Sequence, residues 1–497
     1  MSFDITQCHE RAVPKLSQRS LGSASWPRGG RVHSGIGQQT GQLPSEEKIK
    51  SLKYIDLQSP IIGQVAIGHM IGQTAAIQAL SGPYPPSSMV TRSANRPVAA
   101  AETETVFRIE PTLVDEVPGE LNDVVAELAA ASSKLGASLH PTTAASLADL
   151  VRIMNTYYSN LIEGHNTRPR DIVRALAGDF ARDQERRNLQ LEAAAHVRVQ
   201  REIDRKGALG ALGEPAAAEF IRELHREFYR DAPEPMLRIH ADRRSSLMVP
   251  GEWRSRPEED NVVGRHVPPA SARIPEFMAH FGERYSLGKM RQGARILAIP
   301  ASHHRFNYIH PFPDGNGRVS RLMSHAMGYS AGIAAHGLWS ISRGLARGLK
   351  SRGEYKTMMD RADAPREGDL DGRGNLSRAA LIEFTRWFLE VALDQVNFMA
   401  SLFDIQTLAK RLRTLVERSE TLKGEAAALL EAALMFGEIE RGAAPRITGL
   451  PERTARRVLN DAVEAGLLAS VSPKGPVSLR FPAGVLEVLF PRLYPET

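Results

Sequence analysis

From about Val106 onward, apolar residues recur every three or four positions, with polar residues between them. This spacing puts the apolar side chains on one face of an α-helix, so each such stretch predicts an amphipathic helix. Together these stretches predict a helical bundle through the middle of the chain. The clearest of them are 121–139, 143–164, 216–229, 274–287, 295–308 and 378–403.

Residues 1–105 lack this periodicity. Glycine, serine, proline and glutamine dominate, as in "SASWPRGGRVHSGIGQQTGQ" at 23–42. Such a composition buries too little apolar surface to offset the entropy lost on folding. We therefore predict a low-complexity, disordered or adaptor-like extension. An upstream-extended start site is the alternative interpretation.

One segment between the helices has a different pattern. In "GEWRSRPEEDNVVGRHVPP", residues 251–269, the β-branched pair Val262 and Val263 is followed by Gly264. β-Branched residues favour strands and glycine favours a tight turn, so this segment predicts a small β-hairpin. The predicted fold class is thus mainly α, a helical bundle with one hairpin.

Residues 405–497 are predicted to form a separate domain. The stretch "LPERTARRVLNDAVEAGLL" at 450–468 has one apolar helical face and stops at Gly466. The next segment alternates around Pro473-Lys474-Gly475, which predicts a two-stranded wing. A helix followed by such a strand pair is typical of a winged helix–turn–helix. The apolar face consists of Leu450, Thr454, Val458 and Leu459.

Composition indicates the class of protein and its cellular compartment, but it does not identify the function. The 497 residues are 42% hydrophobic and 24% charged, as in ordinary globular proteins of two or three domains. The single cysteine, Cys8, excludes an internal disulfide and a multi-cysteine metal site and favours a reducing, cytoplasmic compartment. Polar residues interrupt the most apolar stretch, 61–80, so we expect no membrane span, and the N-terminus has no secretory-signal pattern. A net charge of +6 permits binding of nucleotides or nucleic acid without selecting either.

Most of the candidate catalytic and phosphate-binding residues lie in "IHPFPDGNGRVSRLM" at 309–323. Gly315-Asn316-Gly317 can take backbone angles closed to most residues, so that successive N–H groups converge on an anion. The residues that follow are helical in pattern, and a helix N-terminus also favours phosphate. Arg318 and Arg321 lie three positions apart, on one side of that helix, where both guanidinium groups can bind phosphate oxygens.

Two further residues of this stretch add reactive groups. Asp314 is a hard oxygen ligand suited to Mg²⁺ that arrives with a nucleotide. His310 has an ordinary pKa near neutrality, so it can take a proton from a hydroxyl. Together they predict phosphoryl or nucleotidyl transfer. A transition-metal site built from His303, His304, His310 and Asp314 is the alternative, but it leaves both arginines and the glycines unexplained; His303 and His304 fit better as helix-packing residues.

Residues 310–321 match the signature of the Fic family, His-x-Phe-x-Asp/Glu-Gly-Asn-Gly-Arg-x-x-Arg, at every specified position. The resemblance extends over roughly 106–400, including "VVGRHVPP" and "RADAPREGDLDGRGNLSR". It implies a Fic catalytic domain at 186–404, an N-terminal helical region at 106–185 and the winged-helix-like domain at 405–497.

The resemblance implies an adenylyltransferase that moves AMP from ATP to a Ser, Thr or Tyr hydroxyl of a protein. His310 would deprotonate that hydroxyl, and Asp314 would hold Mg²⁺ against the phosphates. Asn316 and the amides of Gly315 and Gly317 would stabilise the α-phosphate. The β- and γ-phosphates would be bound by Arg318 and Arg321, with Phe312 anchoring the loop. Val262, Val263 and Gly264 would form a flap that pairs with the target segment by strand addition.

A second pattern of the same family lies in "SNLIEGHN", where Ser159, Glu163 and Gly164 match its inhibitory helix. A carboxylate delivered to Arg321 would compete with the γ-phosphate for one guanidinium group. The resemblance therefore implies autoinhibition by Glu163. A helix-capping glutamate is the plainer interpretation.

Three alternatives remain open at this point. The chain could be a DNA-binding regulator that contacts DNA through 450–481 and senses nucleotide with its Fic domain. The donor could be UTP or another pyrophosphate-linked substrate, because phosphate contacts do not read the base. The same site could also reverse the modification. Expected partners are ATP and a protein hydroxyl, including one of the chain itself, without a membrane; the sequence leaves oligomerisation open.

Overall fold

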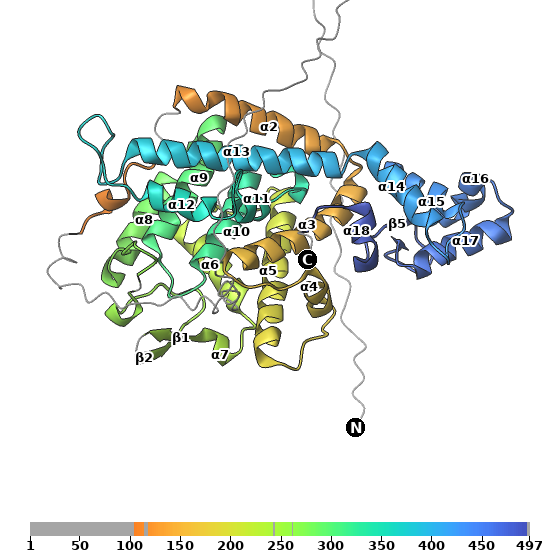
Figure 1. Ribbon diagram of the computed structural model, residues 1–497, viewed down its shortest axis with the longest axis horizontal. Coiled ribbons are helices and arrows are strands. Elements are labelled where there is room, and N and C mark those ends of the chain that lie inside the picture. Colours follow the sequence, from red (N-terminus) through yellow and green to blue (C-terminus); the bar gives the residue numbers. More distant parts are fainter. Residues whose placement is uncertain (1–103, 114–117, 242–243, 261, 495–497) are drawn as a thin grey trace, which may run out of the picture. The chain divides into compact units, whose positions relative to one another are not determined.

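The computed structural model describes residues 104–113, 118–241, 244–260 and 262–494 (Figure 1). Apart from Glu104 and Thr105, the predicted extension over 1–105 lies outside the described residues, and so does Cys8. The described chain is predominantly helical, which confirms the predicted fold class. Among these residues, no helix has both the length and the apolar composition needed to cross a bilayer.

The bundle contains a helix in each of the six stretches whose periodicity predicts one. In chain order its helices are α2 (Asn122–Ala137), α3 (Pro141–Ile162), α4 (Pro169–Leu176), α5 (Gln184–Ala208), α6 (Ala218–Tyr229), α7 (Glu234–Leu237), α8 (Ile274–Arg284), α9 (Gln292–Ile309), α10 (Asn316–Ser330), α11 (Ser342–Arg347), α12 (Glu354–Ala362) and α13 (Arg378–Leu402).

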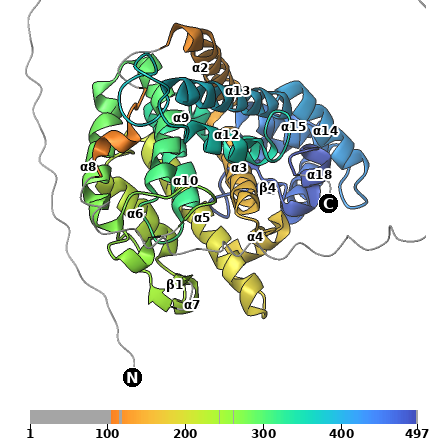
Figure 2. The ribbon, with the colours of Figure 1, turned by 60° about the vertical axis from the view of Figure 1, so that its left-hand side comes forward.

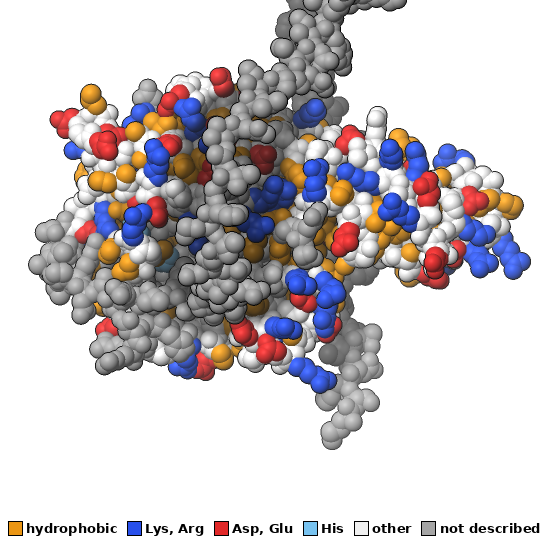
Figure 3. All heavy atoms as spheres, viewed as in Figure 1, with side chains coloured by type: hydrophobic (Ala, Val, Ile, Leu, Met, Phe, Trp, Pro, Cys, Tyr) orange, Lys and Arg blue, Asp and Glu red, His pale blue; other side chains and the backbone are white. Residues whose placement is uncertain are grey.

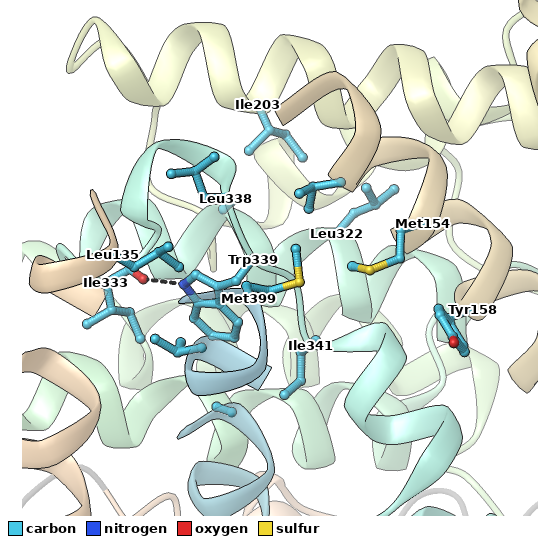
Figure 4. Packing of buried hydrophobic residues seen from close by; sticks show 14 of the residues in the cluster. Leu135, Met154, Tyr158, Ile203, Leu322, Ile333, Leu338, Trp339, Ile341 and Met399 are labelled. Carbon is cyan, nitrogen blue, oxygen red and sulfur yellow. Dashed lines mark hydrogen bonds between the residues drawn. The ribbon is translucent and has the colours of Figure 1, made fainter. Parts of the chain in front are cut away.

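Helices α9 and α10 pack against each other and are buried around nearly their whole circumference (Figure 2). Figure 4 shows part of the apolar core beside α10, where Leu322 meets Met154 of α3 and Met399 of α13. Trp339 fills the same region, and its indole N–H donates to the Ile333 carbonyl over 2.6 Å. Because both helices are enclosed by core, the loop that joins them is held at a fixed place.

This part of the chain contains a strand pair that the sequence does not predict. An antiparallel pair joins β1 (Arg238–Ala241) and β2 (Arg244–Leu247). At the predicted small hairpin, Val263 and His266 form an antiparallel bridge in which each N–H donates to the other residue's carbonyl over 2.9 Å. The predicted hairpin is therefore present as a single bridge among the described residues. Pro268 and Pro269 follow after Val267, and because proline has no N–H it cannot extend the ladder.

Residues after 404 form a C-terminal module of short helices and a three-stranded antiparallel sheet, with strand order β3-β5-β4. The predicted helix and wing coincide with α17 and with β4 and β5. On α17, Val458 and Leu459 are buried as expected. The winged-helix assignment itself stays a prediction. The elements are α14 (Ile405–Glu417), α15 (Ala426–Phe436), β3 (Glu438–Ile439), α16 (Ala444–Thr448), α17 (Glu452–Glu464), β4 (Leu468–Ala469), β5 (Val477–Leu479) and α18 (Leu486–Leu489).

The C-terminal module packs directly on α3. Near the start of α3, the buried Thr143 hydroxyl donates to the Leu434 carbonyl over 3.1 Å. Near its end, the Tyr158 hydroxyl donates to the Leu493 carbonyl over 3.2 Å. The module therefore contacts α3 along most of its length, up to the residues that precede Glu163.

This docking gives a stability prediction at Gly437, in the turn after α15. Gly437 has φ +78°, and a Cβ there would lie 1.8 Å from the Nδ1 atom of His140, the N-cap of α3. Gly449 has a similar φ of +72° but open space around it. We expect Gly449→Ala to lose about 1 kcal/mol for its left-handed backbone. We expect Gly437→Ala to lose about 1–3 kcal/mol more, because the His140 ring must move and give up its capping bond to the Thr142 N–H.

Calorimetric thermal unfolding of both variants measures the difference. Equal losses would mean that the module and α3 are not in contact at His140.

Candidate active site

The loop between α9 and α10 is a sharp reversal built from residues that cannot continue a helix. His310 ends α9 in the left-handed region, with φ 51° and ψ 60°, and Pro311 follows. Gly315, with φ 80° and ψ 3°, then starts α10 at Asn316. The first N–H groups of α10 have no partner within the helix, so they point out of its N-terminus.

The buried Arg254 holds the start of this loop. Its Nε atom donates to the His310 carbonyl over 2.7 Å, and its Nη2 atom donates to the Ile309 carbonyl over 3.1 Å. Asp260 pairs with the same guanidinium group. Burial lowers the pKa of Arg254 to about 10, so it stays charged at neutral pH. A charged side chain thus fixes the backbone on which His310 stands.

Phe312 and Asn316 hold the other half of the loop. The Phe312 ring is fully buried and stacks on His225, with ring centroids 3.9 Å apart. The Asn316 amide accepts from the Phe312 N–H over 2.9 Å and donates to the Phe312 carbonyl over 2.8 Å. The described contacts of the Asn316 side chain therefore position the loop. Its predicted contact with the α-phosphate stays a prediction.

Both glycines of the turn are required by close neighbours. A Cβ on Gly315 would lie 2.8 Å from the Tyr229 hydroxyl, and the φ of +80° already disfavours other residues. A Cβ on Gly317 would lie 2.5 Å from a carboxylate oxygen of Glu163. That oxygen therefore lies directly over the first turn of α10, where unpaired N–H groups favour an anion.

Arg321 is enclosed by the end of α3. Its Nε atom donates to the Ser159 hydroxyl over 2.9 Å, and its Nη2 atom pairs with Glu163 over 2.6 Å. Burial alone would raise the pKa of Glu163, but Arg321 and Arg318 outweigh it and lower that pKa, so the carboxylate is ionised. The chain then leaves the helix at Gly164, with φ 90°. The family resemblance implies this pairing between residues 158 positions apart, and the structure contains it. The inhibitory role of Glu163 stays a prediction.

Arg318 has a different set of partners. Its Nε atom lies 2.7 Å from the Glu192 carboxylate of α5, and its Nη1 atom donates to the Tyr229 hydroxyl over 2.8 Å. Tyr229 in turn donates to Asp314 over 3.0 Å. Burial raises the pKa of the Glu192 carboxyl, and Arg318 opposes that rise. A continuous polar chain therefore links α5, α6 and the loop.

Asp314 has the properties of a cation ligand. Burial would raise its pKa, but Arg318, the Gly315 N–H and Tyr229 lower it, so the carboxylate is ionised. Its side chain is 49% exposed beside the turn. Mg²⁺ prefers carboxylate and phosphate oxygens together, so this residue fits an ion that arrives with a nucleotide.

His310 is half-buried next to the turn. Burial and the nearby charge of Arg254 lower its pKa to about 3, so the imidazole is neutral at physiological pH and can accept a proton. His303 and His304 are buried elsewhere, bonded to Ser324 and to the Met359 carbonyl, as helix-packing residues. Within the described residues, no three metal-ligating side chains converge, so the transition-metal alternative lacks its cluster.

The predicted flap residues lie in the turn bridged by Val263 and His266. The His266 Nε2 atom lies 2.7 Å from the Tyr308 carbonyl near the end of α9, which ties the turn to the helix that carries His310. Gly264 is exposed at its tip, and Val262 and Val263 are half-buried. Their target-binding role stays a prediction.

Sequence reasoning missed Tyr229, Glu192 and Arg254. Each lies on a segment outside the motif and has no distinctive spacing relative to it. Glu192 and Tyr229 sit in ordinary amphipathic helices, where a charged or aromatic residue carries no signal. The buried position of Glu192 on α5 is the one feature that a helical projection could have flagged.

Part of this chain is similar in sequence to known proteins. Residues 215–327 match the Fic/DOC family. A stretch of 72 residues is 39% identical to "Protein adenylyltransferase Fic" of Nematostella vectensis, covering 14% of this chain and 17% of that relative. A stretch of 70 residues is 34% identical to the protein of the same name from Aedes aegypti, covering 14% of each. The matches thus span well under two thirds of either relative.

Two solved structures are similar at low identity. A Fic family protein from Desulfovibrio desulfuricans G20 has 17% identity and a TM-score of 0.43, over 74% of this chain and 98% of that one. A Fic domain protein from Bacteroides thetaiotaomicron has 18% identity and a TM-score of 0.42, over 56% and 95%. The family match at 215–327 contains the whole 310–321 motif, so the chain contains a Fic domain in this region.

Proposed function

We propose that this chain is a Fic-type transferase, an adenylyltransferase that moves AMP from ATP to a Ser, Thr or Tyr hydroxyl of a protein. The observation that carries the proposal is the glycine turn at the N-terminus of α10, which neutral His310 precedes at the end of α9 and two buried arginines follow on α10. The relatives named as adenylyltransferases match only over short stretches, so their activity supports this proposal without settling it.

In the proposed step, the hydroxyl oxygen attacks the α-phosphorus while the bond from that phosphorus to the bridging oxygen of the β-phosphate breaks. His310 takes the hydroxyl proton, and pyrophosphate leaves with its charge against Arg318 and Arg321. The first amides of α10 donate to the α-phosphate as charge builds there. Asp314 would hold Mg²⁺, which neutralises phosphate charge when bound. The turn at 262–264 would align the target segment by backbone pairing.

We also propose that the described conformation is an inhibited one. Glu163 occupies the Nη2 atom of Arg321, and its oxygen lies where Gly317 has no room for a methyl group. An anion and this carboxylate therefore compete for the same guanidinium and the same helix terminus. Release of Glu163 would free both for the γ-phosphate.

The first prediction concerns the base. In a Glu163→Gly background, His310→Ala should lower AMP transfer by about 10²–10⁴-fold, the usual loss for a positioned base. Affinity for Mg·ATP should change little, because the base acts on the hydroxyl. Labelled-AMP transfer and calorimetric binding on the same preparation measure both. His336→Asn, at an exposed histidine, is the control; equal transfer with and without His310 would refute the assignment.

The depressed pKa of His310 adds a test of pH dependence. An ordinary histidine, with a pKa near 6.5, would be about three-quarters protonated at pH 6. With a pKa of about 3, His310 stays neutral there, so kcat/KM should not fall between pH 8 and pH 6. A fall with a midpoint near pH 6.5 would contradict this expectation.

The second prediction concerns inhibition. Glu163→Gly should raise transfer by more than about tenfold, because it frees the charged guanidinium of Arg321 for phosphate. Glycine is the better probe, since the amide oxygen of glutamine could still accept from Arg321.

The same Glu163→Gly protein tests the identity of the donor, with each labelled nucleoside triphosphate supplied in turn. Release of AMP from the labelled protein tests whether the site also reverses the modification.

Two further variants isolate the mechanism of that gain. Adding Arg321→Ala to Glu163→Gly should abolish it, since the freed partner is then missing. Glu417→Gly is the matched control, because Glu417 also ends a helix but is exposed. If Glu163→Gly only lowers the melting temperature, as Glu417→Gly should, then Glu163 is a helix-capping residue.

Binding of duplex DNA through 450–481 is a second proposal. On α17, Arg453, Arg456 and Arg457 are exposed, but Glu452 lies 2.6 Å from Arg456. Figure 3 shows acidic side chains among the basic ones at the end of the molecule where α16 and α17 lie. If the proposal holds, duplex DNA should retain the protein at low salt and release it steeply as salt rises. No retention at low salt would remove this candidate.

A further inference from the structure

Both phosphate-binding arginines of the proposed site are paired with carboxylates, but from different kinds of position. Arg321 pairs with Glu163, which caps the C-terminal end of α3. Arg318 pairs with Glu192, which lies well inside α5. The inhibitory pattern accounts for Glu163. Glu192 lies outside both the 310–321 motif and the family match at 215–327.

The two carboxylates differ in their freedom to leave. Glu163 stands next to Gly164, where the chain turns with φ 90°, and its side chain is 19% exposed. Glu192 is 6% exposed, and α5 packs against α3, α4, α6 and α10. Withdrawal of Glu192 would require movement of a helix held on four sides. Glu163 is therefore the exchangeable counter-charge and Glu192 the permanent one.

They also contact different nitrogens of their guanidinium groups. Glu163 accepts from Nη2 of Arg321, a terminal nitrogen that a phosphate would use. Glu192 lies 2.7 Å from Nε of Arg318, the nitrogen next to the side-chain stem, and so on the side of the group away from Nη1. Nη1 of Arg318 contacts the Tyr229 hydroxyl, which itself lies against Gly315 of the turn. Phosphate can therefore bind Arg318 at the turn while Glu192 remains in place.

A counter-charge that stays in place lowers the affinity of a phosphate for its arginine. A buried guanidinium that loses its closest carboxylate is unfavourable, so removal of Glu192 would destabilise the free protein even though Tyr229 and Asp314 remain near Arg318. Bound phosphate would supply the missing negative charge and offset that loss. Without Glu192, the phosphate-bound protein would therefore lose less stability than the free protein. By linkage, the affinity of the protein for phosphate would rise.

We propose that Glu192 is a positioning residue, acting through Arg318, that limits how tightly the β- and γ-phosphates are held and so lets pyrophosphate leave. This inference rests on the proposed function, because it requires those phosphates to contact Arg318. It predicts that loss of Glu192 changes the affinity only for ligands that carry the β- and γ-phosphates. Loss of a residue that only stabilised the fold would not change affinity in this selective way.

The test uses the full chain carrying Glu163→Gly, with and without Glu192→Gln. Calorimetry measures binding of Mg·ATP, magnesium pyrophosphate and AMP. With Glu192→Gln, affinity for Mg·ATP and pyrophosphate should rise by about tenfold, whereas affinity for AMP, which lacks the β- and γ-phosphates, should not change. Glu202→Gln is the matched control, since Glu202 lies on the same helix but is exposed and paired with Arg205.

Each other outcome has a definite meaning. Unchanged affinity for all three ligands would mean that Glu192 only stabilises the fold. Weaker binding of Mg·ATP would mean that Glu192 holds Arg318 in the orientation that binding requires. Either outcome would overturn the proposal. If Glu192→Gln does not fold, Glu192→Asp keeps the charge but shortens its reach, and a smaller rise in the same two affinities is expected. Failure of the Glu163→Gly protein itself to bind Mg·ATP would instead refute the proposed function.

Discussion

Two guanidinium groups buried at the N-terminus of α10 constrain the helices around them. A buried cation is tolerated only when opposite charge and hydrogen-bond acceptors surround it. Arg318 and Arg321 draw these partners from separate helices: Glu163 from α3, Glu192 from α5 and Tyr229 from α6. The packing of α3, α5 and α6 on α10 is therefore set by charge as well as by apolar contact.

This arrangement makes α3 a shared element of two regions. Its last turn encloses Arg321, while Thr143 and Tyr158 bind backbone carbonyls of the C-terminal module. A helix moves largely as a rigid body, so a contact at one end constrains the other. The position of Glu163 is thus determined by the bundle and by the module together.

Sequence patterns predicted the helices and the loop motif, because amphipathic spacing and glycine requirements are local properties of the chain. The distant pairing of Glu163 with Arg321 came instead from the resemblance to the Fic family. The patterns failed for Glu192, Tyr229 and Arg254, whose roles arise only when segments far apart in sequence are packed together. The small hairpin around 262–264 was predicted from its β-branched residues, and the prolines that follow limit it to a single bridge. The strands β1 and β2 are only four residues each, so the alternation within them was too short to mark them.

The motif itself shows why local and distant constraints meet at one residue. In the proposed mechanism, Gly317 lacks a side chain so that an anion can approach the first amides of α10, and this is a local requirement. The same gap admits the Glu163 oxygen, which would lie 2.5 Å from a Cβ at this position. A site open enough for the proposed phosphate would thus also be open to a carboxylate of the protein's own chain. The proposed inhibition by Glu163 therefore requires no structure beyond what the proposed phosphate binding demands, only a helix end that delivers the charge.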